Sequence, residues 1–465
     1  MPRSPGMVVR MAEITAPTLP ARATKPLLVW AIAAAIPLML LAPALWNGYP
    51  LLQSDTGGYL ARWYEGYLVP SRSTVFGLYL HYGEHTDFWL NLGIQALATM
   101  WILLLTLRVF GLPGPWRLFG VSLLLTLTTA LPWLTSMLLT DIFSGLSVLS
   151  LLILVLHGDK ISRGEKLALF VFTAVAGATH SATMGILLGL CIVAWIARPF
   201  LRVRIPAWHL MQGTLTIAAG AVMLLAGNFA LSGKIAWTPG GYSIAFARML
   251  QDGIVTRYLN DHCATQQFKL CPYRNELPET ADDFLWSRES VFNQLGRFAG
   301  MSDEMSNIAS GALIQYPLWQ AEAALVDTGE QMLRVATGEN TDHPTLMHTY
   351  GIFREFLPQQ LKAVDAARQQ KSHLTFGPFN LVHVPVALIS TVLVFALLIA
   401  AIFRRRADDV TLLMATVCLT LLGNAFICGV ISGPHDRYGS RLVWITTLAF
   451  MIAVMKRSHE SSGPA

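Results

Sequence analysis

Charged residues are scarce in this sequence. Only 13% of its 465 residues are Asp, Glu, Lys or Arg, whereas 54% are hydrophobic. A soluble domain carries about 25% charged residues, so these few charges cannot cover a water-exposed surface. A glycine-rich phosphate loop of the Walker type is also missing, which argues against a nucleotide cofactor. The formal net charge of +5 follows membrane orientation and does not predict binding to nucleic acid.

Cysteine is equally rare, with five residues in the chain. Cys191, Cys418 and Cys428 lie in apolar segments, where cysteine acts as a small hydrophobic residue. Cys263 and Cys271 lie in a polar segment with seven residues between them, and a disulfide is reasonable there in an oxidising compartment. The CxxC spacing of zinc sites does not occur.

Long apolar runs, by contrast, are abundant. A run of about 18 apolar residues is long enough to cross a hydrocarbon core of about 30 Å. The sequence therefore predicts an all-α membrane protein of about ten transmembrane helices. The predicted spans are 27–46, 89–107, 118–134, 137–156, 167–179, 181–197, 209–231, 381–403, 410–432 and 441–455.

Basic residues predict the orientation of these spans. With ten spans, 17 of the 33 Lys and Arg fall in the tails and short loops of one side, and four fall in the short loops opposite. Merging 167–179 with 181–197 would scatter the positive charges over both sides, so ten spans with both termini cytoplasmic is the favoured interpretation. The first span also resembles a signal peptide, with Ala42-Pro43-Ala44 as a cleavage site, but an uncleaved anchor is simpler.

The predicted organisation in a bacterial inner membrane has two transmembrane parts and one large periplasmic insertion. Within the first part, the periplasmic loop 47–88 contains a helical pattern over 55–68, which we expect to lie on the outer membrane interface and to end before Pro70. The insertion contains further helical patterns near 244–260, 286–300, 313–336 and 346–371. The parts are a cytoplasmic tail at 1–26, transmembrane parts at 27–231 and 381–455, a helical periplasmic domain at 232–380, and a second cytoplasmic tail at 456–465.

Two aspartates are the leading candidates for chemistry. Asp141 lies about one turn inside the outer end of span 137–156. An ionisable group at membrane depth is costly and suggests function by default, although it can also reach the interface or pair with an outer arginine. Asp55 stands at the start of the interfacial helix, where its simplest role is to cap the helix. Tyr59 and Arg62 follow at helical spacing and are expected to share its face.

Basic and aromatic side chains are predicted at the same membrane face. His180 lies in the outer turn between two spans, although a lone histidine is more often a hydrogen-bonded structural residue. His435, Arg437 and Arg441 crowd the last outer turn, and guanidinium groups suit a phosphate or carboxylate. Their alternative role is to end the helix at the membrane boundary. Together these groups could hold a lipid phosphate while a carboxylate acts as a base.

These residues resemble motifs of the GT-C superfamily, the membrane glycosyltransferases that use polyprenyl-phosphate sugars. The lipid A aminoarabinose and galacturonic acid transferases and the protein O-mannosyltransferases are examples. Asp55 with Tyr59 looks like the acidic motif of the first outer loop, Leu139-Thr140-Asp141 like a second aspartate motif, and Arg437-Tyr438 like a late Arg-Tyr pair. Thr56 stands where many members have Glu.

The resemblance implies a role for each of these residues. Asp55 would be the catalytic base, Asp141 would orient the acceptor or help to bind a divalent metal, and Arg437 or Arg441 would hold the lipid phosphate. The expected partners are a polyprenyl-phosphate-linked sugar and membrane lipids. A transporter or lipid flippase, a polysaccharide polymerase or ligase, and a non-catalytic assembly factor are the alternatives.

Overall fold

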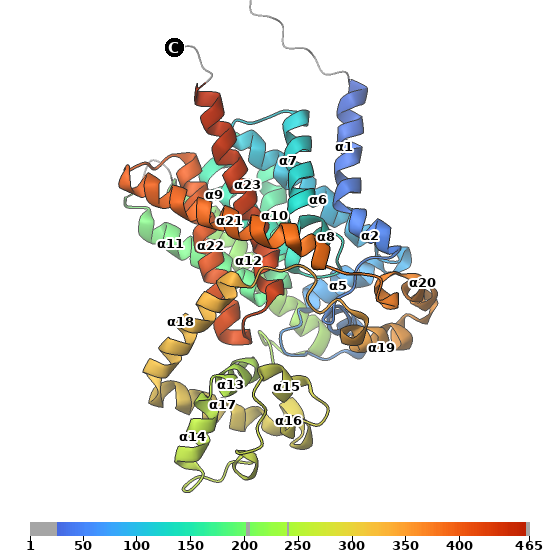
Figure 1. Cartoon of the computed structure of the whole chain (residues 1–465), viewed down its shortest axis with the longest axis vertical. Helices are drawn as coiled ribbons and strands as arrows, with labels where there is room; N and C mark the ends of the chain where they lie inside the picture. The colour runs from blue at the N-terminus through green and yellow to red at the C-terminus, as the bar shows by residue number, and fades with distance from the viewer. Residues whose placement is uncertain (1–25, 201–204, 240, 462–465) are drawn as a thin grey trace, which may run out of the picture.

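The computed structural model describes residues 26–200, 205–239 and 241–461, and these residues form an all-helical protein without a β-strand (Figure 1). Within this part of the chain, six helices are long and apolar enough to cross a membrane. They are α6 (Trp89–Val109), α9 (Asp141–His157) with the 3₁₀ turn that continues it to Lys160, α12 (Ala207–Ser232), α21 (Gly377–Phe403), α22 (Asp409–Ser432) and α23 (Asp436–Ser461). The protein therefore has the helix composition of a multi-pass membrane protein.

The remaining predicted spans are also helical, but their helices are shorter. They correspond to α1 (Pro26–Leu40), α7 (Pro115–Thr128), α10 (Arg163–Thr179) and α11 (Ser181–Ala197). A capping box between Ser162 and Glu165 begins α10, and the extended backbone of His180 separates α10 from α11. These two segments are thus separate helices, as expected, rather than one long helix.

The two ends of this helix bundle differ in what they carry. At one end α1 begins and α23 finishes, and we call it the terminal end (Figure 1). The opposite end carries Asp55 and Asp141, and we call it the Asp55 end. Helices α13 to α17 lie beyond the Asp55 end, and α19 lies beside this end (Figure 1). The long insertion therefore covers the end at which the candidate residues gather.

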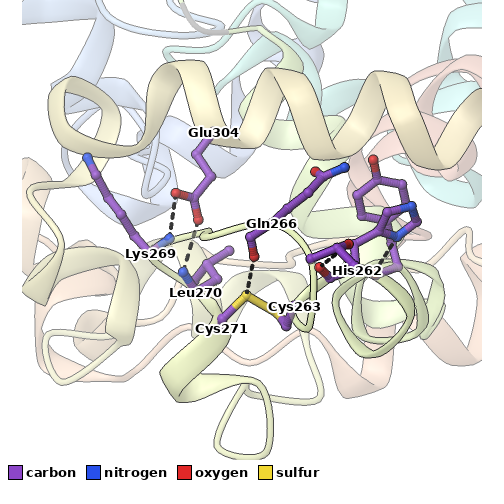
Figure 2. The surroundings of a disulfide bond; sticks show 9 residues. His262, Cys263, Gln266, Lys269, Leu270, Cys271 and Glu304 are labelled. Atoms are coloured by element: carbon purple, nitrogen blue, oxygen red, sulfur yellow. Dashed lines mark hydrogen bonds between the residues drawn. A yellow bond between two sulfur atoms is a disulfide. The ribbon is translucent and has the colours of Figure 1, made fainter.

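The insertion at 232–380 contains two differently packed parts. The first part has its own hydrophobic core, which includes the fully buried Phe246, Phe284 and Phe292. A disulfide joins Cys263 to Cys271, and the Glu304 carboxylate accepts hydrogen bonds from the backbone of Lys269 and Leu270 beside it (Figure 2). The helices of this part are α13 (Tyr242–Gln251), α14 (Ile254–His262), α15 (Ala281–Trp286), α16 (Val291–Gln294) and α17 (Arg297–Gln315).

The second part of the insertion packs on the bundle instead. After α18 (Pro317–Leu333), the helices α19 (Met347–Phe356) and α20 (Leu361–Ala366) contribute Phe353 and Val364 to the main core. The Gln369 side chain donates to the Leu52 carbonyl at 2.6 Å and accepts from the Leu52 amide at 3.0 Å. The insertion is thus a small helical unit followed by a segment that packs on the loop 47–88. We call this segment, residues 347–369, the strap.

That loop is helical where expected, but its residues 56–62 are buried rather than laid on a surface. It contains the end of α2 (Ala42–Asn47), then α3 (Thr56–Leu60), α4 (Arg62–Glu65) and α5 (Thr74–Gly83). All residues of α3 are buried. A Cβ atom on Gly57 would lie 2.6 Å from the Thr349 backbone of α19, so only glycine allows this approach. The expected interfacial helix is therefore a pair of short helices enclosed between α5 and α19.

Candidate functional site

Arg437 joins the two aspartates that the sequence analysis singles out. Its Nη1 donates to Asp55 Oδ2 at 2.6 Å, and its Nε donates to Asp141 Oδ2 at 3.0 Å. Asp55 precedes α3, Asp141 begins α9 and Arg437 lies in the first turn of α23. Three segments far apart in sequence thus meet at one guanidinium group.

Backbone pairing explains why Asp55 lies so close to Asp141. The Leu51 amide donates to the Ser136 carbonyl, and the Leu138 amide donates to the Leu51 carbonyl, both at 2.9 Å. Thr56 Oγ1 then donates to the Leu138 carbonyl at 3.0 Å. These bonds hold the segment before α3 against the segment before α9, so the two carboxylates begin their helices side by side.

Asp55 has a second basic partner, Arg72. The two side chains form a short ion pair, and the Arg72 guanidinium lies 5.5 Å from the centre of the Tyr59 ring. Asp55 occupies the N-cap position of α3, but its carboxylate bonds to these arginines instead of the helix backbone. The capping interpretation of Asp55 is therefore not the one that the structure adopts.

Arg441 lies one turn after Arg437 and is completely buried. Asn424 of α22 accepts from Arg441 Nη2 at 2.6 Å, and His180 Nδ1 lies 3.3 Å from Nη1. Arg441 Nη1 also lies 3.7 Å from Asp141 Oδ1, an oxygen that accepts no hydrogen bond from the described residues. Arg441 thus brings His180 and α22 into the cluster and leaves one acidic oxygen for a further donor.

Glu339 fixes the start of α23. Its carboxylate accepts from the Arg437 amide at 2.8 Å and lies 2.9 Å from His435 Nδ1. This pairing with Glu339, opposed by burial, raises the pKa of His435 above its usual value. The Tyr438 ring centre lies 5.7 Å from the Arg437 guanidinium and 5.4 Å from that of Arg441. Glu339 therefore positions the backbone of the residue that joins the aspartates.

The charges of the cluster favour ionised acids. Burial alone would raise the pKa of Asp55, but Arg72 and Arg437 outweigh it and lower that pKa to about 2. Burial and the neighbouring arginines hold the pKa of His180 well below its usual range. His180 is thus neutral at pH 7, so its ring nitrogen can accept a hydrogen bond from Arg441.

A narrow cleft opens beside this cluster. It has a volume of about 20 Å³, which is room for a water molecule but not for a sugar. Arg72 and His180 line it together with Asn228 of α12 and Trp237. A larger ligand must therefore move side chains here, and Arg72 is the lining residue that bonds directly to Asp55.

Most of the predicted site residues meet, but Arg62 does not join them. Its guanidinium donates to the carbonyls of Gly58 and Tyr67 and to Glu65, so it supports the loop 47–88 from within. The expected shared face of Asp55 and Arg62 is not formed, because the helix breaks between α3 and α4. Tyr59 is buried against Phe76 and reaches the cluster only through Arg72.

Sequence reasoning missed Arg72 and Glu339. Arg72 follows Pro70 in a loop, and Glu339 lies in the insertion, so neither has helical spacing to another site residue. The one available signal is that Arg62 and Arg72 are the only Lys or Arg residues of the loop 47–88.

The two aspartates do not form a fitting metal site in this arrangement. A guanidinium group lies between them where a cation would bind, and both carboxylates bond to it. The described residues contain no group of three or more His, Cys, Asp or Glu side chains placed to hold a metal ion.

Comparisons of the chain with protein-family models, with curated proteins and with solved structures find no match.

Proposed function

We propose that this protein is a glycosyltransferase of a bacterial inner membrane that moves a sugar from a polyprenyl phosphate to a hydroxyl group. The observation that carries the proposal is the Arg437 bridge between Asp55 and Asp141. It combines a potential base with a phosphate-binding group at one end of an apolar bundle. The motifs that resemble the GT-C superfamily are those that meet there.

The proposed topology has ten spans, with both termini in the cytoplasm and the Asp55 end in the periplasm. The four shorter helices α1, α7, α10 and α11 then cross the bilayer together with the six longer ones. Clustered basic residues at the terminal end, such as Arg404, Arg405 and Arg406, support this orientation. The disulfide between Cys263 and Cys271 also suits an oxidising periplasm.

The proposed reaction is an inverting displacement at the anomeric carbon of the sugar. Asp55 takes the proton of the acceptor hydroxyl, whose oxygen forms a bond to this carbon. The bond from the carbon to the phosphate oxygen breaks, and the lipid phosphate leaves with the electron pair. Arg437 and Arg441 stabilise the charge that develops on the departing phosphate. Positioning and electrostatics supply the catalysis, because the donor brings its own leaving group.

Binding of the donor would also activate the base. With two arginines as partners and a pKa of about 2, Asp55 is too weak a base in the unliganded protein. A donor phosphate competes for Arg72 and Arg437, so it releases the carboxylate and raises the pKa of Asp55. Proton transfer is thereby restricted to the protein that holds a donor.

The polar side chains within the spans favour transfer over transport. A transporter needs polar groups that can bind a solute near the middle of the membrane. Gln95 instead donates to the carbonyls of Thr135 and Met137, and Asn228 donates to those of Ala236 and Trp237. Their hydrogen bonds are used within the fold, as are those of Asn424 with Arg441.

Asp55→Asn tests the proposal. Membranes with the variant should transfer radiolabelled sugar from polyprenyl phosphate at least about 100-fold more slowly than membranes with the wild type, since the amide cannot accept the proton. Insertion should be unchanged, and the thermal unfolding midpoint should fall modestly, because the arginine partners that lower the pKa of Asp55 make its ionised form stabilising by on the order of 2 kcal/mol. Asp87→Asn is the matched control, because Asp87 is an exposed acid of the same loop.

Near-normal transfer by Asp55→Asn would remove Asp55 as the base. Wild-type membranes that use only an oligosaccharide on a lipid diphosphate would instead support the polymerase or ligase alternative.

A further inference from the structure

A second charged cleft lies at the terminal end of the bundle, opposite the proposed active site. It has a volume of about 220 Å³ and is formed by the end of α21, the start of α22 and the end of α23. It is thus about ten times larger than the cleft beside Arg72. None of its lining residues takes part in the proposed reaction.

Basic side chains dominate this terminal cleft. Arg404 and Arg406 lie in the turn after α21, and Lys456 and Arg457 lie near the end of α23. In the described part of the chain, these four side chains form no ion pair. They contrast with Arg108 at the same end, which pairs with Glu165 at 2.8 Å.

The two acids of the terminal cleft already have partners. Asp408 caps α22 by accepting from the Thr411 amide and hydroxyl, each at 2.8 Å. Asp409 pairs with Lys160 at 3.1 Å. Four cations against two carboxylates leave a net charge of +2 in the cleft, so it favours an anion.

Part of the cleft wall is apolar and continues into a lipid-facing surface. Leu397, Ala401 and Met414 line its inner side. Only 22% of the most apolar stretch of α21 is buried within the protein, and Ile402 and Phe403 beside the cleft are exposed. An anion bound here would have its charge between arginines and room for an apolar tail along α21.

We propose that the terminal cleft binds the phosphate of an anionic phospholipid, with the acyl chains along Ile402 and Phe403. Basic pockets between membrane helices suit lipid phosphates for this reason. Positive charge that served only to orient the chain would not need a cleft. The bound lipid would hold the ends of α21, α22 and α23 together, independently of sugar transfer.

Retention of lipids on the delipidated full-length protein, measured by native mass spectrometry, tests this proposal. Wild-type protein should retain phosphatidylglycerol at least about tenfold better than phosphatidylcholine. Each basic residue near an anionic lipid contributes about fivefold to binding, so the double variant Arg404→Gln/Arg406→Gln should weaken phosphatidylglycerol binding roughly 30-fold. Its thermal midpoint without lipid should match that of the wild type, since both side chains are exposed.

The matched control is Arg163→Gln/Lys166→Gln, which removes two charges at the same end but outside the cleft. It should retain phosphatidylglycerol as the wild type does. Equal retention of both lipids by the wild type, or an equal loss in the control, would overturn the proposal. Displacement of the lipid by millimolar inorganic phosphate would also overturn it, because the cleft would then be a site for free phosphate.

Discussion

Two clusters in this protein have the same centre, one largely buried arginine between two aspartates. Arg437 bonds to Asp55 and Asp141, and Arg248 bonds to Asp252 at 2.7 Å and to Asp327. The first cluster joins three segments at the Asp55 end. The second joins α13 to α18 within the insertion and supports the turn before α23, where Gly433 lies next to the Arg248 side chain.

The surroundings of the two arginines differ in the sign of the excess charge. Burial and the neighbouring Asp327, opposed by Arg248, raise the pKa of Asp252 to about 6, because one guanidinium serves two acids. The additional arginines around Asp55 overcome the same effect of burial and lower its pKa to about 2. The Arg248 cluster therefore has no excess positive charge, whereas the Arg437 cluster can bind an anion.

Replacing each central arginine with glutamine should reveal the largest difference between the two clusters. Arg437→Gln should lower sugar transfer by at least about 100-fold, as expected for losing a donor to the developing charge. The fold should survive, since Asp55 keeps Arg72 and Asp141 keeps Arg441 nearby. Arg248→Gln should instead lower the free energy of unfolding by about 3–5 kcal/mol, because it leaves the buried Asp327 and the half-buried Asp252 without their arginine partner.

Transfer rates and thermal midpoints measured on both variants separate the two effects. Arg437→Lys keeps the charge but cannot contact both aspartates with one planar group, so it should recover only part of the activity. If Arg437→Gln unfolds the protein as Arg248→Gln does, the two clusters are alike and both are structural.

Asp252→Asn tests the charge of the Arg248 cluster through the pH dependence of protein stability. The raised pKa means that the folded state holds the Asp252 proton more tightly than the unfolded chain does, so this group costs stability as the pH rises from about 4 to about 6. At pH 7 the variant should be more stable than the wild type by on the order of 2–3 kcal/mol. The difference should shrink below pH 6.

Chemical denaturation of the two proteins at pH 5 and pH 7 would measure this difference. A gain that is the same at both pH values would show that Asp252 does not titrate in this range.

The apolar helices and the side chains that meet at Arg437 could be predicted because each leaves a local signal. Apolar runs mark the helices, and an aspartate at the end of such a run is conspicuous by its cost. Positive charges then assigned Asp55, Asp141 and the arginines of the last turn to one end of the bundle, and the structure places these side chains at that end.

What the sequence could not predict depends on contacts between distant segments. Arg72 pairs with Asp55 because a loop returns over α3, and Glu339 reaches the Arg437 amide from the insertion. The strap that encloses α3 depends on bonds such as that between Gln369 and Leu52. No periodicity or charge bias along the chain encodes such pairings. The residue pattern of the loop 47–88 alone therefore predicts a helix on the membrane surface.

Glu339 offers the mildest test, because it acts on Arg437 through the backbone. Its pairing raises the pKa of His435, so this contribution is complete below the unfolded value of 6.5 and is lost as the pH rises through the higher folded value. Glu339→Gln can still accept from the Arg437 amide but cannot pair with a protonated His435. Transfer by this variant should be about tenfold slower than wild type at pH 6, as for a small misplacement of a catalytic group, and should approach wild type at alkaline pH.

Glu339→Ala loses both contacts and should stay slow throughout. A Glu339→Gln deficit that does not change with pH would mean that the charge of His435 has no part in positioning Arg437.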